Sequence, residues 1–213
     1  MKFPPTLKTE ARDEAYEYFD KHIRKLTKTN DGKVDPTVLG LEENDIDAFR
    51  HAYVSGVFTQ EYSESAADIF GQLNEYMSFG SSSSNQEKAT NMDLWNNSVG
   101  RKYGKQIKDR KTLLKKIHEA LKNGELIIDL KDPRQFKGTQ FDPTSQKSVI
   151  VLKEGENGRN IVFFDLTNQK MLSVDEFVTA IQLGQYPSYG LKTINGTLTP
   201  FSKPDGSSKN NLG

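Results

Sequence analysis

Residues 45–60 read DIDAFRHAYVSGVFTQ and carry the strongest structural signal in the chain. Asn44 or Asp45 can cap a helix here that runs from about Ile46 to Gln60. Its apolar residues fall on two nearly opposite sides, Phe49, Ala52, Tyr53 and Gly56 on one and Val54 and Phe58 on the other. A helix that is apolar on two sides is typically buried between neighbours. The sequence therefore predicts that this helix is the central element of the domain.

Four further amphipathic helices are predicted on either side of this stretch, from apolar residues spaced by three or four positions. Their expected ranges are residues 10–26, from Ser63 or Ser65 to Met77, from Thr90 or Asn91 to about Gln106, and about 111–122. The last of them stops at Asn123 and Gly124, residue types that commonly end helices.

The pattern changes after Gly124. Residues 126–130, 148–153 and 160–166 are expected to form short strands, the last two joined as a hairpin by turn residues 154–158. Ser173-Val-Asp-Glu176 is a capping box that opens a further helix, which ends near Gly184. From Tyr186 onward the chain is rich in Gly, Pro, Ser and Asn, and it is expected to be an extended tail.

This order, helices first and strands later, predicts an α+β fold. We expect a mainly helical core of about five to six helices in residues 1–124, which carries the polar motifs described below. Residues 125–213 are expected to form a small subdomain with an antiparallel β-hairpin or sheet, a further helix near the C-terminus and the extended tail. We expect this subdomain to pack on the core as one unit.

Composition disfavours several classes of protein. Lys plus Arg and Asp plus Glu both number 29, so the formal charge is zero and no nucleic-acid partner is expected. The chain has no cysteine, which excludes disulfides, thiolate zinc sites and cysteine nucleophiles. No stretch approaches the ~20 apolar residues of a transmembrane segment, and residues 1–20 lack a signal-peptide core. We expect a cytoplasmic protein, or one exported without a cleaved signal; its partner, a small molecule or a protein, and its oligomeric state stay open.

Of the three histidines, His51 differs because it lies on the helix predicted to be buried. Asp47 lies four residues earlier on the same face and can hold or charge the imidazole. Arg50 is adjacent to His51, and an arginine on a buried helix needs an anionic partner.

A second polar block lies on the fourth predicted helix. Beside the apolar stripe of this helix lies a second stripe, which consists of Asp93, Asn97, Gly100 and Gly104. Asn96 lies between the apolar stripe and this second stripe. Carboxylate and amide groups at the edge of a core need partners. The glycines permit close approach by a neighbouring helix, which should offset their helix-propensity cost of roughly 0.5–1 kcal/mol each. On the intervening helix, Glu75 is the acidic residue that we expect to join His51 and Asp93.

Both blocks resemble an uncharacterised bacterial family of domains of unknown function. They read Asp47-Ala-Phe-Arg-His-Ala-Tyr53 and Met92-Asp-Leu-Trp-Asn-Asn-Ser-Val-Gly-Arg101, with Asn74-Glu75 between them. The family pattern is Arg-His-Ala-Tyr-Trp, a His-Glu pair and Met-Asp-Leu-His-Asn-Asn-x-x-Gly, and the resemblance covers about residues 41–104. It implies a domain that occurs alone, in phage-related genes and in large secreted toxin-like proteins.

The sequence departs from that pattern at two positions. Asn74 and Trp95 stand where the family often has histidine, so His51 is the only imidazole left in the region. A zinc site that depends on those histidines is therefore disfavoured. We expect no cofactor and no metal ligand; another divalent cation is possible but unsupported.

Three interpretations of the polar cluster stay open. It can be a hydrolase-like site with His51 as base, a structural network that fixes helix packing, or a ligand site in a non-catalytic interaction protein. The third would use the serine-rich segment 79–87 and the tail at 186–189 as binding surfaces. The residues expected to serve catalysis are His51, Asp93 and Glu75, and those expected to bind a ligand are Arg50, Asp47, Asn96 and Asn97.

Overall fold

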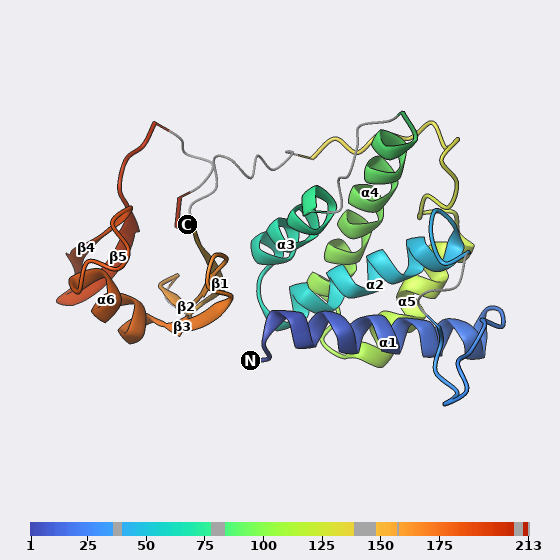
Figure 1. Ribbon diagram of the computed structural model, residues 1–213, viewed down its shortest axis with the longest axis horizontal. Helices are drawn as coiled ribbons and strands as arrows, with labels where there is room; N and C mark the ends of the chain where they lie inside the picture. The colour runs from blue at the N-terminus through green and yellow to red at the C-terminus, as the bar shows by residue number, and fades with distance from the viewer. Residues whose placement is uncertain (36–39, 78–83, 139–147, 157, 207–210, 213) are drawn as a thin grey trace. The chain divides into compact units, whose positions relative to one another are not determined.

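The computed structural model describes residues 1–35, 40–77, 84–138, 148–156, 158–206 and 211–212 (Figure 1). The chain divides into two compact units, Met1–Phe141 and Asp142–Gly213. The α+β class predicted from the order of the elements is confirmed, with five of the six described helices in the first unit and all five described strands in the second.

The first unit is helical. It contains α1 (Pro4–His22), α2 (Asp45–Glu61), α3 (Glu64–Met77), α4 (Ser84–Gln106) and α5 (Arg110–Lys122). The predicted helices are confirmed, although α1 begins six residues before the predicted start and α4 also begins earlier. Ser84–Glu87, at the end of the serine-rich segment, form the first turn of α4, whereas residues 78–83 lie outside the described residues.

The helix α2 is the centre of this unit. It contacts α1, α3, α4 and α5, and 12 of its 17 residues are buried. The Asn44 side chain caps it by accepting hydrogen bonds from the backbone N–H groups of Ile46 and Asp47. The central position predicted from its two apolar sides is therefore confirmed.

Glycines bring α4 against α2. A Cβ added to Gly100 would lie 1.9 Å from the backbone oxygen of Ala52, and one added to Gly104 would lie 2.3 Å from that of Gly56. No side chain fits at either position, so the backbones of the two helices are in direct contact. In Figure 1, α4 crosses α2, while α1 lies on another side of α2. The close approach predicted for Gly100 and Gly104 is thus confirmed.

The segment that follows α5 does not form the strand predicted at residues 126–130. Its backbone groups bond to side chains instead of to a neighbouring strand. The Asn96 amide of α4 accepts from the N–H of Ile127 and donates to its carbonyl oxygen, both at 2.9 Å. The Arg134 guanidinium donates to the carbonyl oxygens of residues 124–126. The residue pattern shows that Leu126 and Ile127 are apolar, but it does not show which groups form hydrogen bonds with their backbone N–H and carbonyl groups.

The second unit contains a three-stranded antiparallel sheet, a helix and a hairpin. The sheet has the order β1 (Val149–Glu154), β2 (Asn160–Asp165) and β3 (Lys170–Ser173), and α6 (Val174–Gln182) follows directly. The β1–β2 hairpin and the Ser173–Glu176 capping box were both predicted and are confirmed. The short strand β3 was not predicted.

Most of the predicted extended tail is folded. Strands β4 (Tyr189–Ile194) and β5 (Thr197–Ser202) form an antiparallel hairpin. Its two-residue loop is Asn195–Gly196, and both residues have positive φ, 49° and 75°. Asn-Gly is the preferred pair for such a loop because both positions require left-handed backbone, so the expectation of a tail missed a recognisable hairpin signal. Within this unit, Tyr189 packs with Phe163 and Phe177 in the core.

In the described part of the chain, no helix combines the length and the apolar character needed to cross a membrane.

We predict that Gly100→Ala destabilises the protein by at least about 1–3 kcal/mol, because the added methyl group meets the backbone of Ala52 and overpacks the contact. The free energy of unfolding in urea measures this effect. Lys105→Ala, on the exposed surface of the same helix, is the control and should cost at most about 1 kcal/mol. Equal losses in the two variants would show that the α2–α4 contact is not as tight as described.

Candidate functional site

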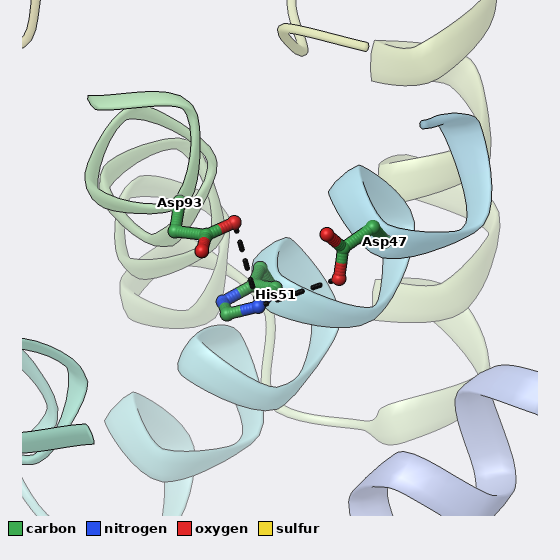
Figure 2. Close-up of side chains that lie close together, drawn as sticks. All are labelled: Asp47, His51 and Asp93. Atoms are coloured by element: carbon green, nitrogen blue, oxygen red, sulfur yellow. Dashed lines mark ion pairs between the residues drawn. The ribbon is translucent and has the colours of Figure 1, made fainter. Parts of the chain in front are cut away.

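A cluster of polar side chains from three helices surrounds His51. The helix α2 supplies Asp47, Arg50 and His51, at the i, i+3 and i+4 spacing that places them on one face. Figure 2 shows the carboxylates of Asp47 and Asp93 on two sides of the imidazole, Asp93 coming from α4. The side chains of Asp47 and His51 are 7% and 9% exposed, so the cluster lies largely inside the unit.

The imidazole of His51 faces three carboxylates. Its Nε2 atom lies 3.5 Å from Oδ1 of Asp47 and 3.5 Å from Oδ1 of Asp93. Its Nδ1 atom lies 3.8 Å from Oε1 of Glu75, which comes from α3. The structure thus brings together the three residues that the sequence nominated for catalysis, and Asp47, which the sequence placed on the same helix face as His51, lies on the Nε2 side.

Arg50 closes one side of the cluster. Its Nη2 atom lies 2.9 Å from Nε2 of His51 and also donates to the carboxylate of Asp47. A guanidinium has only donors, so Nε2 must accept, and the neutral imidazole carries its proton on Nδ1. The Nε atom of Arg50 is buried without a hydrogen-bond partner, while the side chain as a whole is 23% exposed.

Burial and neighbouring charges alter the titration of the cluster. Burial, followed by the adjacent Arg50, lowers the pKa of His51, which favours the neutral imidazole. Burial, followed by the nearby Glu75 and Asp47, raises the pKa of Asp93 well above its ordinary value. The proximity of the Glu75 carboxyl group is thus one of the causes that favour the neutral form of Asp93.

Asn97 is buried beside the imidazole and hydrogen-bonds to it. Gly71 of α3 makes room for this amide, since a Cβ there would lie 3.2 Å from Nδ2 of Asn97. Of the two amides nominated from the sequence, Asn97 therefore belongs to the cluster.

Asn96 does not join the cluster. Its side chain is fully buried and both of its polar groups bond to the backbone of Ile127. Trp95 is engaged with the same region, because its Nε1 atom donates to the carbonyl oxygen of Glu125 at 2.9 Å. The Trp95 departure from the family pattern thus concerns the segment after α5 and not the surroundings of His51.

The other acidic residues of α3 are engaged elsewhere. Asp68 pairs with Arg101 at 3.0 Å, and Glu64 pairs with Lys105 at 2.8 Å. Of the acids of α3, Glu75 is thus the one that faces His51, and it is the one that the sequence singled out.

Lys8 of α1 is a neighbour of the cluster that the sequence did not reveal. Its Nζ atom donates to Oδ1 of Asn74, the residue before Glu75. Desolvation, followed by the charge of Arg50, lowers the pKa of Lys8, so the two cations lie close to one another. Lys8 is one of many lysines in the chain, and nothing in its local sequence distinguishes it.

Comparison with known proteins relates the helical unit to a family. Residues 6–125 match the family described as a domain of unknown function, DUF6973. No curated protein and no solved structure matches the chain. The matched range spans α1 to α5 and so contains every residue of the His51 cluster.

We predict that Asn96→Ala lowers the free energy of unfolding by about 2 kcal/mol or more, because it leaves the buried N–H and carbonyl groups of Ile127 unsatisfied. Asn91→Ala is a matched control. Asn91 makes the same pair of bonds, to the carbonyl oxygen of Arg134 and the N–H of Phe136, but it is half-buried and water can replace it. Urea unfolding compares the two; a larger loss in Asn91→Ala would contradict the structural role of Asn96.

Proposed function

The chain belongs to the DUF6973 family of domains of unknown function, and we propose that this member is a hydrolase that activates water at the His51 cluster. One observation carries the proposal: Nε2 of a largely buried imidazole lies 3.5 Å from the carboxylates of both Asp47 and Asp93. The second ring nitrogen faces Glu75. An imidazole oriented by a carboxylate on one nitrogen is a common arrangement for general-base catalysis at the other.

His51 is the base in this proposal. When Arg50 moves away from Nε2, a water molecule can take its place and donate a hydrogen bond to that nitrogen. The water oxygen attacks the electrophilic centre of the substrate while its proton passes to Nε2. The imidazolium then returns that proton to the leaving group, so the ring ends the reaction neutral. Glu75, on the Nδ1 side, orients the ring and stabilises its transient positive charge.

Arg50 and Asn97 stabilise the negative charge that develops on the substrate. The buried Nε–H of Arg50 has no hydrogen-bond partner, so this donor can bind the substrate when Arg50 leaves Nε2 of His51. The amide of Asn97 lies against the imidazole and offers a second polar group. Preorganised donors of this kind contribute about 3–4 kcal/mol each to transition-state stabilisation in hydrolases with an oxyanion hole.

The setting of this activity is also part of the proposal. The Arg-His-Ala-Tyr and Met-Asp-Leu-x-Asn-Asn blocks resemble those of bacterial domains in phage-related genes and toxin-like proteins. A hydrolase with an effector role in bacteria fits that resemblance.

A structural network is the competing interpretation, and the low exposure of His51 favours it. The imidazole is 9% exposed, and the Asp93 side chain is 15% exposed. Buried networks of this type can fix the arrangement of helices without any reaction. A non-catalytic interaction protein would have the same buried cluster and a binding surface elsewhere.

We predict that the whole protein hydrolyses at least one class in a panel of chromogenic carboxylic esters, phosphate mono- and diesters and anilides. His51→Gln should lower kcat on the order of 10²–10⁴-fold, because general-base catalysis is lost. Glu64→Gln, an exposed partner of Lys105 outside the cluster, should retain full activity.

Urea unfolding of the same variants separates the two interpretations. If His51→Gln unfolds more easily while no substrate in the panel is hydrolysed by the unaltered protein, the cluster is a structural network. If His51→Gln hydrolyses its substrate at the original rate, His51 is not the base.

A further inference from the structure

Three ligand-type atoms of the cluster converge on one point. Oδ1 of Asp47, Nε2 of His51 and Oδ1 of Asp93 all lie within 4.8 Å of one another. Each carboxylate atom is 3.5 Å from the imidazole nitrogen between them (Figure 2). Two of the three side chains are one helical turn apart on α2, and the third is on α4, which the glycine contact holds against α2.

These separations suit a single metal ion. With bonds of about 2.0–2.2 Å, neighbouring ligands in tetrahedral or octahedral coordination lie roughly 3–3.5 Å apart. The 3.5 Å distances from Nε2 of His51 to the two carboxylates are close to that range, and the two carboxylate atoms lie at most 4.8 Å apart.

The opposite side of the imidazole is arranged as it is in metal sites. Glu75 faces Nδ1, the nitrogen that carries the proton in the neutral ring. A histidine that binds a metal through one nitrogen almost always donates from the other to a carboxylate, a carbonyl group or water, which fixes the tautomer and the ring. Glu75 lies 3.8 Å from Nδ1, so its charge favours a proton on that nitrogen and leaves Nε2 facing the two aspartates. This observation is independent of the aspartates themselves.

A cationic group already bridges two of the three atoms. Nη2 of Arg50 contacts both Oδ1 of Asp47 and Nε2 of His51. Three carboxylates face the His51 imidazole that this guanidinium contacts. Arg50 is not fully engaged, because its Nε atom has no hydrogen-bond partner, and its side chain is 23% exposed. Another cation could displace it.

We propose that Asp47, His51 and Asp93 bind a first-row divalent cation, for which Arg50 is the built-in competitor. One imidazole and two carboxylates suit Mn²⁺, Fe²⁺ or Zn²⁺ better than Ca²⁺, which prefers a shell of oxygen atoms. The expectation of no metal rested on the missing histidines at Asn74 and Trp95, but Trp95 bonds to the segment after α5, and carboxylates supply the ligands instead.

This inference deepens the proposed hydrolase but stands without it, since binding is measured without turnover. A cation on Nε2 prevents His51 from accepting a proton there. In the loaded protein, a water bound to the ion would replace the water activated by the imidazole.

Titration of the whole chain with Mn²⁺, followed by calorimetry and EPR, tests the proposal. We expect one ion per chain, and a pulsed EPR spectrum that shows coupling to an imidazole nitrogen. His51→Gln should lose that coupling, and Asp93→Asn should weaken binding at least tenfold. Arg50→Met should tighten binding by roughly tenfold, a change of about 1.4 kcal/mol. Because this last effect is a gain, it cannot arise from misfolding.

Glu64→Gln is the control, an acidic residue of α3 whose partner is Lys105, and it should bind Mn²⁺ as the unaltered protein does. The proposal is overturned if Arg50→Met binds no Mn²⁺, or if His51→Gln and the unaltered protein bind it equally. If the protein binds no Mn²⁺ but hydrolyses a substrate in the presence of EDTA, the proposed cation site is refuted and the proposed hydrolase stands. If the protein binds Mn²⁺ but hydrolyses no substrate of the panel, the proposed cation site stands and the proposed hydrolase is refuted.

Discussion

The backbone contact between α2 and α4 is the constraint on which the rest of the helical unit depends. Gly100 and Gly104 have no side chains, so the carbonyl groups of Ala52 and Gly56 come directly against α4. At this separation, a short side chain such as Asp93 reaches an imidazole on the other helix. Glycine in a helix interior costs roughly 0.5–1 kcal/mol relative to alanine, and the packing of α2 in the centre of the unit offsets it.

The polar cluster is a consequence of that contact. It gathers three carboxylates, an imidazole and a guanidinium in a region with little access to water. Unpaired charges are costly to bury, and burial accordingly lowers the pKa of His51 and raises the pKa of Asp93, which favours the neutral form of each. Both proposals depend on the same nitrogen atom, because a base and a cation ligand each need an imidazole whose Nε2 can be uncovered.

Two adjacent asparagines of α4 have different roles that their residue type does not predict. Asn96 and Asn97 are equivalent as residue types, but successive residues on a helix point about 100° apart. Asn97 faces His51, whereas Asn96 holds the backbone of Ile127. The Asn195–Gly196 hairpin is a different case, since its signal was present in the sequence and was outweighed by the polar composition around it.

Local patterns were sufficient for the helices, the β1–β2 hairpin, the capping box at Ser173 and the close approach at Gly100, because each depends on neighbouring residues or on one helix face. They also predicted that Asp47 lies beside His51, because the two residues are one helical turn apart on the same helix. Packing brought Lys8 beside the cluster and turned Asn96 away from it. Such choices depend on how helices are rotated against each other, and the summed packing of the whole unit sets that rotation.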